Sequence, residues 1–207
     1  DLKKDQSYFL SRLNQKQLST TLFPLGSMYK SDIRKIDEEY GFHLPGQSES
    51  QDFYGGDYTD LLSVEDKDGD IVLFDSGKVL GHHKGFWHYT IGQRKGLGVA
   101  YTEPLFVIAL DPKENKVIVG TEKLTHQSKV YAKNVSWLGD TDFDKDKIYF
   151  AKIRSTSQGD AARAHKTEDG FALEFLTDVK AATPGQSAVV YDGDRVIASG
   201  VIYDSKL

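Results

Sequence analysis

The sequence predicts a mainly β protein in which a short helical N-terminal segment precedes a small central β domain and a C-terminal β-barrel. Two observations support this prediction. After about residue 68, short apolar runs alternate with turn signals such as Asp169-Gly170 and Asp192-Gly193. The first 44 residues instead place their apolar side chains at helical spacing. Many short strands at this spacing favour one or two small barrels over βαβ units.

Three short helices are expected in the first segment, over residues 5–13, about 15–22 and about 31–40. Asp5 is placed to cap the first helix, because a side-chain carboxylate accepts hydrogen bonds from free amides of a first turn. Gly41 is a natural end for the third helix, since glycine adopts the left-handed conformation that terminates helices.

The strands are expected to begin after a polar, acidic stretch at 47–60, which we interpret as a loop and a domain boundary. A second boundary is expected near 125–128, where the rhythm of strands pauses. The pattern predicts strands near residues 71–74, 79–80, 105–110, 117–119, 129–137, 147–153, 161–165, 171–175, 187–191 and 195–203.

The composition excludes several classes of protein. The chain has 207 residues, a net charge of −5 and no cysteine. Without cysteine there is no disulfide, thiolate metal site or cysteine nucleophile in this chain, and a reducing cytoplasm is the expected compartment. No apolar run approaches the roughly 20 residues that cross a bilayer, and the first residues lack the apolar core of a secretory signal, so no membrane partner is expected.

Charge is unevenly distributed along the chain. Residues 49–75 contain nine acids and one lysine, whereas residues 77–102 contain four cations and no acid. A polyanion such as RNA would meet the second segment. Judged on charge alone, ordinary surface variation is the favoured interpretation.

The most unusual stretch is a basic loop bounded by glycines, Gly92 to Gly98. Gln93, Arg94 and Lys95 lie between the glycines, and aromatic side chains precede them. Cations interleaved with aromatics suit contacts with phosphates and unpaired bases. A basic turn above core aromatics has the same pattern, and the pattern alone leaves both interpretations open. The loop lacks the order of residues found in a P-loop.

Three weaker candidate stretches suit nucleic-acid contacts: Lys4, Asp5 and Gln6 at the first helix, Arg154 and Ser155 after a strand, and Gln186 after a Pro-Gly turn. Each has a plain alternative, namely an N-cap, a solvated loop and a turn. The histidines at 82, 83 and 88 are expected to form hydrogen bonds, since nothing resembles a zinc motif. No catalytic arrangement is recognisable, so these residues alone do not define a reaction.

Taken together, these motifs resemble the C-terminal half of the tRNA-specific 2-thiouridylases. The matching stretches are collinear and are KDQSYFL (4–10), LFPLG (22–26), DIRKI (32–36), ESQDF (49–53), YTIGQRKGLG (89–98) and TPGQSAVVYDGD (183–194). Enzymes of this family use ATP to adenylate the 2-oxygen of the wobble uridine in tRNA anticodons, and a persulfide sulfur delivered by a relay protein then displaces AMP.

The resemblance implies a division into three parts. Residues 1–55 correspond to the tail of the catalytic domain, 56–125 to the small central β domain, and 126–207 to a C-terminal β-barrel resembling domain 2 of elongation factor Tu. It implies tRNA contacts by Lys4, Asp5 and Gln6, by Arg154 and Ser155, and by Gln186. ATP would be bound by an N-terminal domain of the parent protein, since the family's SGGxDS loop does not occur in this chain.

The chain departs from the family at the persulfide position. In many members the ESQD stretch continues to a cysteine, whereas this chain has Tyr54 there, and a phenol forms no persulfide. We therefore expect the isolated chain to be inactive, as the tRNA-binding C-terminal portion of the enzyme. The alternatives are a non-catalytic RNA-binding β-barrel module and a degenerate homologue without thiolation activity.

Overall fold

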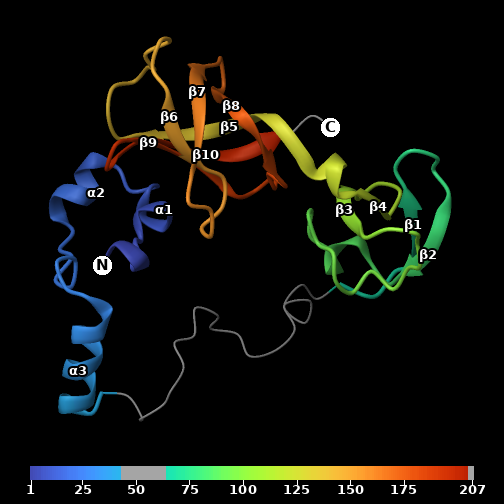
Figure 1. Ribbon diagram of the computed structural model, residues 1–207, viewed down its shortest axis with the longest axis horizontal. Coiled ribbons are helices and arrows are strands. Elements are labelled where there is room, and N and C mark those ends of the chain that lie inside the picture. Colours follow the sequence, from blue (N-terminus) through green and yellow to red (C-terminus); the bar gives the residue numbers. More distant parts are fainter. Residues whose placement is uncertain (43–63, 205–207) are drawn as a thin grey trace.

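The computed structural model describes residues 1–42 and 64–204. Tyr54 and the acidic stretch around it lie outside the described residues. Within the described part, a helical segment, a four-stranded sheet and a closed six-stranded barrel follow one another along the chain (Figure 1). The predicted mainly β fold with a β-barrel is confirmed.

The helical segment contains η1 (Leu2–Lys4), α1 (Ser7–Leu10), α2 (Gln15–Thr20) and α3 (Lys30–Tyr40). A capping box between Asn14 and Gln17 starts α2. The α3 helix begins one residue earlier than expected, and the Asp1 carboxylate accepts a hydrogen bond from its first amide (3.1 Å). Gly41 ends α3 in the left-handed conformation with φ of 64°.

The central sheet contains β1 (Gly69–Leu73), β2 (Val79–His83), β3 (Leu105–Asp111) and β4 (Lys116–Thr121), in the order β2-β1-β4-β3. A short 3₁₀ helix, η3 (Phe86–His88), follows β2. The β1 and β4 strands pair in parallel, and the other neighbours pair antiparallel. The fully buried side chains of this core belong to Ile71, Val107, Val117 and Val119.

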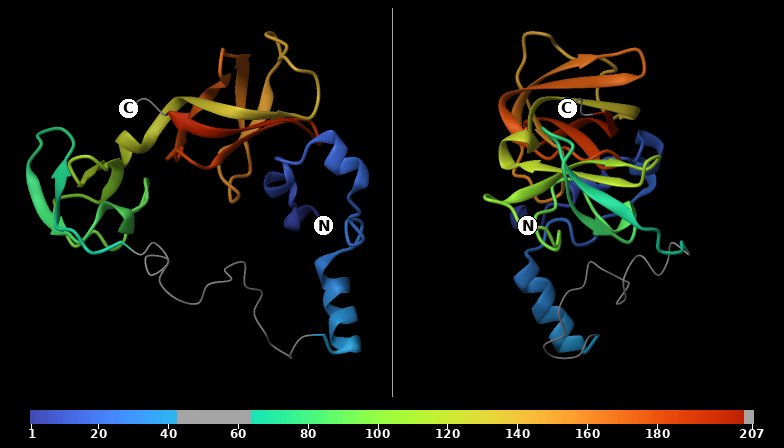
Figure 2. Two further views of the ribbon diagram at one scale, coloured as in Figure 1. Left: turned by 180° about the vertical axis from the view of Figure 1, so that it is seen from behind. Right: turned by 90° about the vertical axis from the view of Figure 1, so that its right-hand side faces the viewer.

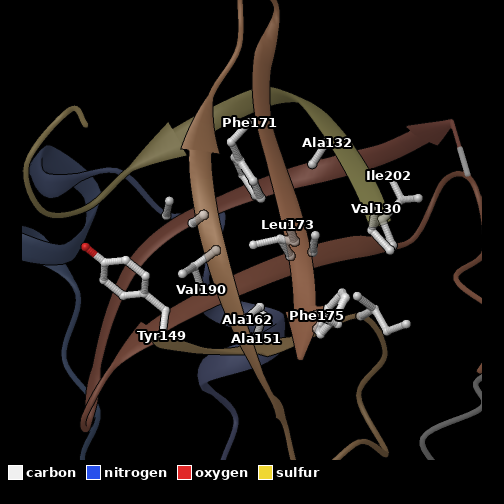
Figure 3. Close-up of a cluster of buried hydrophobic side chains, with 14 of the residues drawn as sticks. Val130, Ala132, Tyr149, Ala151, Ala162, Phe171, Leu173, Phe175, Val190 and Ile202 are labelled. Carbon is white, nitrogen blue, oxygen red and sulfur yellow. The ribbon is translucent and has the colours of Figure 1, made fainter. Parts of the chain in front are cut away.

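The barrel begins after η4 (Glu122–Thr125) and closes in the order β10-β5-β8-β7-β6-β9. Its strands are β5 (His126–Trp137), β6 (Tyr149–Lys152), β7 (Asp160–Lys166), β8 (Gly170–Lys180), β9 (Ser187–Asp192) and β10 (Arg195–Asp204). Alternate residues of β8 point inward, so that Phe171, Leu173 and Phe175 fill the interior (Figure 3).

The barrel lies between the other two parts. The α1 and α2 helices lie against one end of the barrel, the sheet lies at the other end, and α3 projects away from the barrel (Figures 1 and 2). The η4 turn and the long strand β5 connect sheet to barrel. Among the described residues, no helix has the length and apolar character needed to cross a bilayer.

Truncating the barrel core should destabilise the chain strongly. Leu173 is fully buried, so Leu173→Ala is expected to lower the free energy of unfolding by about 3–5 kcal/mol, through lost burial and a residual cavity. Leu176→Ala is the matched control, because Leu176 lies on the same strand with 55% of its surface exposed, and a change within about 0.5 kcal/mol is expected. Urea unfolding measures both, and equal effects would contradict the inward assignment of Leu173.

One histidine of the central sheet is buried. The Nδ1 atom of His83 accepts a hydrogen bond from the Gly85 amide (2.9 Å), so the proton of the neutral ring resides on Nε2, which has no partner among the described residues. Burial lowers the pKa of His83, and the nearby His88 adds to the shift, whereas the backbone of Asn115 and the Asp70 carboxylate oppose it. The fold therefore favours the neutral ring.

This burial predicts a pH dependence. Because the folded pKa of His83 lies below the unfolded value of about 6.5, the unfolded chain binds more protons under that pH, and stability should fall as the pH drops through it. His83→Asn is expected to flatten the slope of Tm against pH below about pH 6.5. His82→Asn, at an exposed neighbour, should leave the slope in place. An unchanged slope in His83→Asn would sink this assignment.

Candidate RNA-binding surface

The first candidate stretch lies at the start of α1, which is fixed to the barrel by hydrogen bonds. The Tyr8 hydroxyl donates to the Ser187 carbonyl (2.9 Å), and Ser7 Oγ lies 3.1 Å from the Tyr191 hydroxyl. The buried Ser11 donates to Ser199 Oγ (3.0 Å). These bonds attach α1 to β9 and β10.

Asp5 shows why the Lys4-Asp5-Gln6 stretch has a defined position. Its carboxylate accepts hydrogen bonds from the amide and the hydroxyl of Ser7 (2.8 Å each), although the N-cap residue of α1 is Gln6 and not the predicted Asp5. Lys152 Nζ on β6 lies 3.7 Å from the same carboxylate. Although partial burial acts to raise the pKa of Asp5, the Ser7 hydrogen bonds and the Lys152 charge hold it below its usual value. Lys4, Asp5 and Gln6 remain exposed.

The Pro-Gly turn places Gln186 beside α1. The Gly185 amide donates to the Ile202 carbonyl, and the Ile202 amide donates to the Gln186 carbonyl (2.8 Å each). The backbone of the turn is therefore paired with β10, while the Gln186 side chain is exposed. The next residue along the chain, Ser187, is the one that accepts from Tyr8.

Arg154 braces the end of β8. Its guanidinium Nη2 donates to the main-chain carbonyls of Lys180 and Ala181. Burial raises the pKa of Tyr8, and the nearby Arg154 charge opposes this rise. Arg154 is half-buried and Ser155 is exposed. The predicted phosphate-binding arginine thus has a structural contact on one side.

The basic loop is fixed to the same point of the barrel. A Cβ atom on Gly92 would lie 2.7 Å from the Ala181 Cβ, so the close approach requires glycine. The Gln93 side chain is used within the loop, where it accepts from the Thr90 amide (3.0 Å) and donates to the Lys95 carbonyl (2.9 Å). This bracing leaves Arg94 and Lys95 exposed at the tip.

Lys180 adds a second link between the central sheet and the barrel. Its ammonium group pairs with Glu122 of η4 and lies 4.6 Å from the centre of the Phe106 ring on β3. The hydrogen bond from Lys180 lowers the pKa of Glu122. The basic loop therefore contacts the barrel at Ala181, and the central sheet contacts the barrel at the adjacent residue, Lys180.

We call the four predicted stretches together the barrel-edge surface and define it by Lys4–Gln6, Gln93–Lys95, Arg154–Ser155 and Gln186. Contacts at Ser187 join the first stretch to the Gln186 turn, and contacts at Ala181 join the basic loop to Arg154. Tyr54 lies outside the described residues. Contact of this surface with RNA stays a prediction.

Sequence reasoning missed three residues that position this surface, Tyr8, Lys152 and Tyr191. Tyr8 carries a weak signal, since it is an aromatic residue in the first turn of a short helix. Lys152 and Tyr191 carry none, because their contacts with α1 depend on the closure of the barrel.

The histidines at 82, 83 and 88 have separate partners. His82 lies 2.9 Å from the Asp70 carboxylate, and His88 lies 3.5 Å from that of Asp66. Across the described ranges, no three side chains of His, Asp or Glu gather as metal ligands do.

Removing the Tyr8 hydroxyl should loosen the helical segment. Tyr8→Phe deletes the bond to Ser187 and should weaken docking of α1 by about 1 kcal/mol, so that residues 1–42 are cleaved roughly fivefold faster in limited proteolysis. Tyr29→Phe is the control, because Tyr29 is 65% exposed. Equal cleavage rates for the two variants would show that the Tyr8 bond does not hold the segment.

Three family models match successive parts of the chain. A model described as a tRNA methyl transferase HUP domain matches residues 1–54, a tRNA methyl transferase PRC-barrel domain matches 62–121, and an aminomethyltransferase beta-barrel domain matches 127–202. The last two ranges contain the central sheet and most of the barrel.

Curated relatives match the chain almost end to end. A protein named tRNA-specific 2-thiouridylase MnmA from Endomicrobium trichonymphae is 43% identical over 205 residues, which cover 98% of this chain and 57% of the relative. Proteins of the same name from Rickettsia canadensis and Aquifex aeolicus are 40% and 37% identical, over 98% and 99% of the chain and 57% and 58% of their own lengths. The chain thus spans a little over half of these relatives, and it belongs to the family of tRNA-specific 2-thiouridylases.

Proposed function

We propose that this chain is the tRNA-binding C-terminal portion of a cytoplasmic, ATP-dependent tRNA-uridine 2-sulfurtransferase, which thiolates the 2-position of the wobble uridine. The observation that carries the proposal is the barrel-edge surface, where contacts at Ser187 and Ala181 bring the four stretches together in two pairs. The barrel holds the Lys4-Asp5-Gln6 stretch beside the target base, while Arg94, Lys95 and Gln186 contact the surrounding RNA.

The descriptions of the family models name methyl transfer, whereas the relatives are named for thiolation. We base the proposal on the relatives, because they match the chain nearly end to end at about 40% identity.

ATP does not suit the residues present. The described part contains no glycine loop leading into a helix N-terminus of the kind that holds a triphosphate, and the sequence contains neither SGGxDS nor a P-loop. We therefore assign ATP binding, and docking of the sulfur-relay protein, to other parts of the parent enzyme.

Exposed apolar side chains in the helical segment support the idea of a larger parent domain. Within residues 1–42, α3 has no buried residue, and large apolar side chains are exposed at Leu2, Phe9, Leu22, Phe23, Leu25, Tyr29, Tyr40 and Phe42. Such a density of exposed apolar surface is typical of a covered interface. We propose that residues 1–55 complete the catalytic domain, with 56–125 as the central domain and 126–207 as the barrel.

The absence of cysteine supports a second candidate function, tRNA binding without thiolation. With Tyr54 in place of the persulfide cysteine, the parent either obtains sulfur differently or is a homologue that binds tRNA without thiolating it. Measuring 2-thiouridine in tRNA from cells lacking the gene separates the two, since an unchanged level would favour the second.

Binding of tRNA to the chain tests the proposal. The affinity should fall as salt rises, because cations that contact phosphates release bound counterions. Arg94→Ala combined with Lys95→Ala is expected to weaken binding about tenfold and to reduce the slope of log K against log salt by about 1 to 2.

Lys113→Ala combined with Lys145→Ala is the matched control, because both lysines are exposed and neither belongs to the barrel-edge surface. This pair should leave the slope nearly unchanged. Affinity that is independent of salt, or equal losses in the two double variants, would overturn the proposed interface.

A further inference from the structure

An open cavity of about 450 Å³ lies beside the basic loop. Its walls include Arg94, Gly96 and Gly98 on one strip of chain and Tyr101 and Glu103 on the next. This volume is within the range of small-ligand sites, which begins at about 300 Å³. Only Arg94 belongs to the barrel-edge surface.

The polar groups that line this cavity lack partners within the described part of the chain. Arg94 and Glu103 form no hydrogen bond or ion pair there, not even with each other, although they line the same cavity. The amides of Gly96 and Gly98 donate no hydrogen bond to any described residue. A Cβ on Gly98 would meet no atom within 4 Å, so its backbone is open to a ligand.

The cavity is held open by buried anchors on both strips. Leu97 and Leu105 are buried in the core of the central sheet, with 7% and 5% of their surface exposed. The root of the loop is paired with β3 through the Gly92 amide and the Gln93 carbonyl (2.8 and 2.9 Å). Because the walls are fixed, a ligand would enter without first ordering them, which favours binding.

The lining supplies groups suited to the phosphate and to the base of a nucleotide. Arg94 and the two glycine amides are donors for a phosphate, and the ring of Tyr101, a residue with 44% of its surface exposed, is a platform for a base. Glu103 is an acceptor only, so it selects a base edge that presents donors. We propose that this cavity binds one unpaired guanosine nucleotide of an RNA, with Glu103 as the residue that determines its specificity.

Guanine is the base that satisfies a carboxylate. Its Watson–Crick edge carries N1–H and N2–H side by side, and the two oxygens of Glu103 accept from both. Adenine, cytosine and uracil each place an acceptor next to a donor on that edge, which repels one carboxylate oxygen. This inference rests on the proposed function for one point, that the ligand is RNA, and it adds the base that the cavity selects.

The test compares fluorescently labelled RNA hexamers that differ at one position, with guanosine, inosine or adenosine among uridines. Anisotropy with the whole chain at low salt should show guanosine bound about tenfold more tightly than inosine, which lacks the N2 donor, a ratio equal to about 1.4 kcal/mol. Glu103→Gln should abolish the preference. The control Glu168→Gln, at an exposed residue between β7 and β8, should retain it.

The outcomes separate this inference from the proposed function. Equal affinity for the three hexamers, or a preference that persists in Glu103→Gln, overturns the guanosine site even if tRNA binds in the salt-dependent way expected above. A guanosine preference that Glu103→Gln abolishes, in a chain that does not bind tRNA, supports the site and overturns the proposed function.

Discussion

Closure of the barrel by β10 is the constraint on which the rest of the structure depends. The β10 strand pairs with β9 on one side and with β5 on the other, so it joins the two ends of a sheet that would otherwise have open edges. The α1 helix is attached to β9 and β10 through Ser187, Tyr191 and Ser199. If the sheet were not closed, the partners of α1 on β9 and β10 would not be held at fixed positions, and the Lys4-Asp5-Gln6 stretch would lose its position.

A single residue of the barrel, Ala181, contacts both the turn before the barrel and the basic loop of the central domain. Ala181 adopts a left-handed conformation, with φ of 51°, which costs a non-glycine residue about 1–2 kcal/mol. The neighbouring contacts offset that cost, since its carbonyl accepts from Arg154 and from Thr183 and its amide donates to Thr125. Gly92 packs on its side chain. The barrel, the turn that links it to the sheet, and the basic loop therefore all contact Ala181, a strained residue whose amide and carbonyl are both hydrogen-bonded.

Local signals predicted the strands but not how they pair. Alternation at Phe171, Leu173 and Phe175 identifies β8 without reference to any neighbour. The parallel pairing of β1 with β4 has no such signal, because it depends on where the long segment after β2 returns. The same limit applies to the site. Its candidate residues are visible as motifs, whereas the contact of Lys152 with Asp5 and the bracing by Arg154 arise only after closure of the barrel.

These contacts determine which cations of an acidic chain are left for the proposed RNA-binding surface. The net charge of −5 is distributed unevenly, and even within the basic segment Lys84 is paired with Asp68 at 2.7 Å. Arg94 and Lys95 have no acidic partner at that range among the residues that the structure describes. Two cations alone supply little attraction in salt solution. Under the proposed function, attraction of RNA to this surface therefore depends on fixed geometry, in which bracing by Gln93 and anchoring by Leu97 order the loop before any ligand arrives.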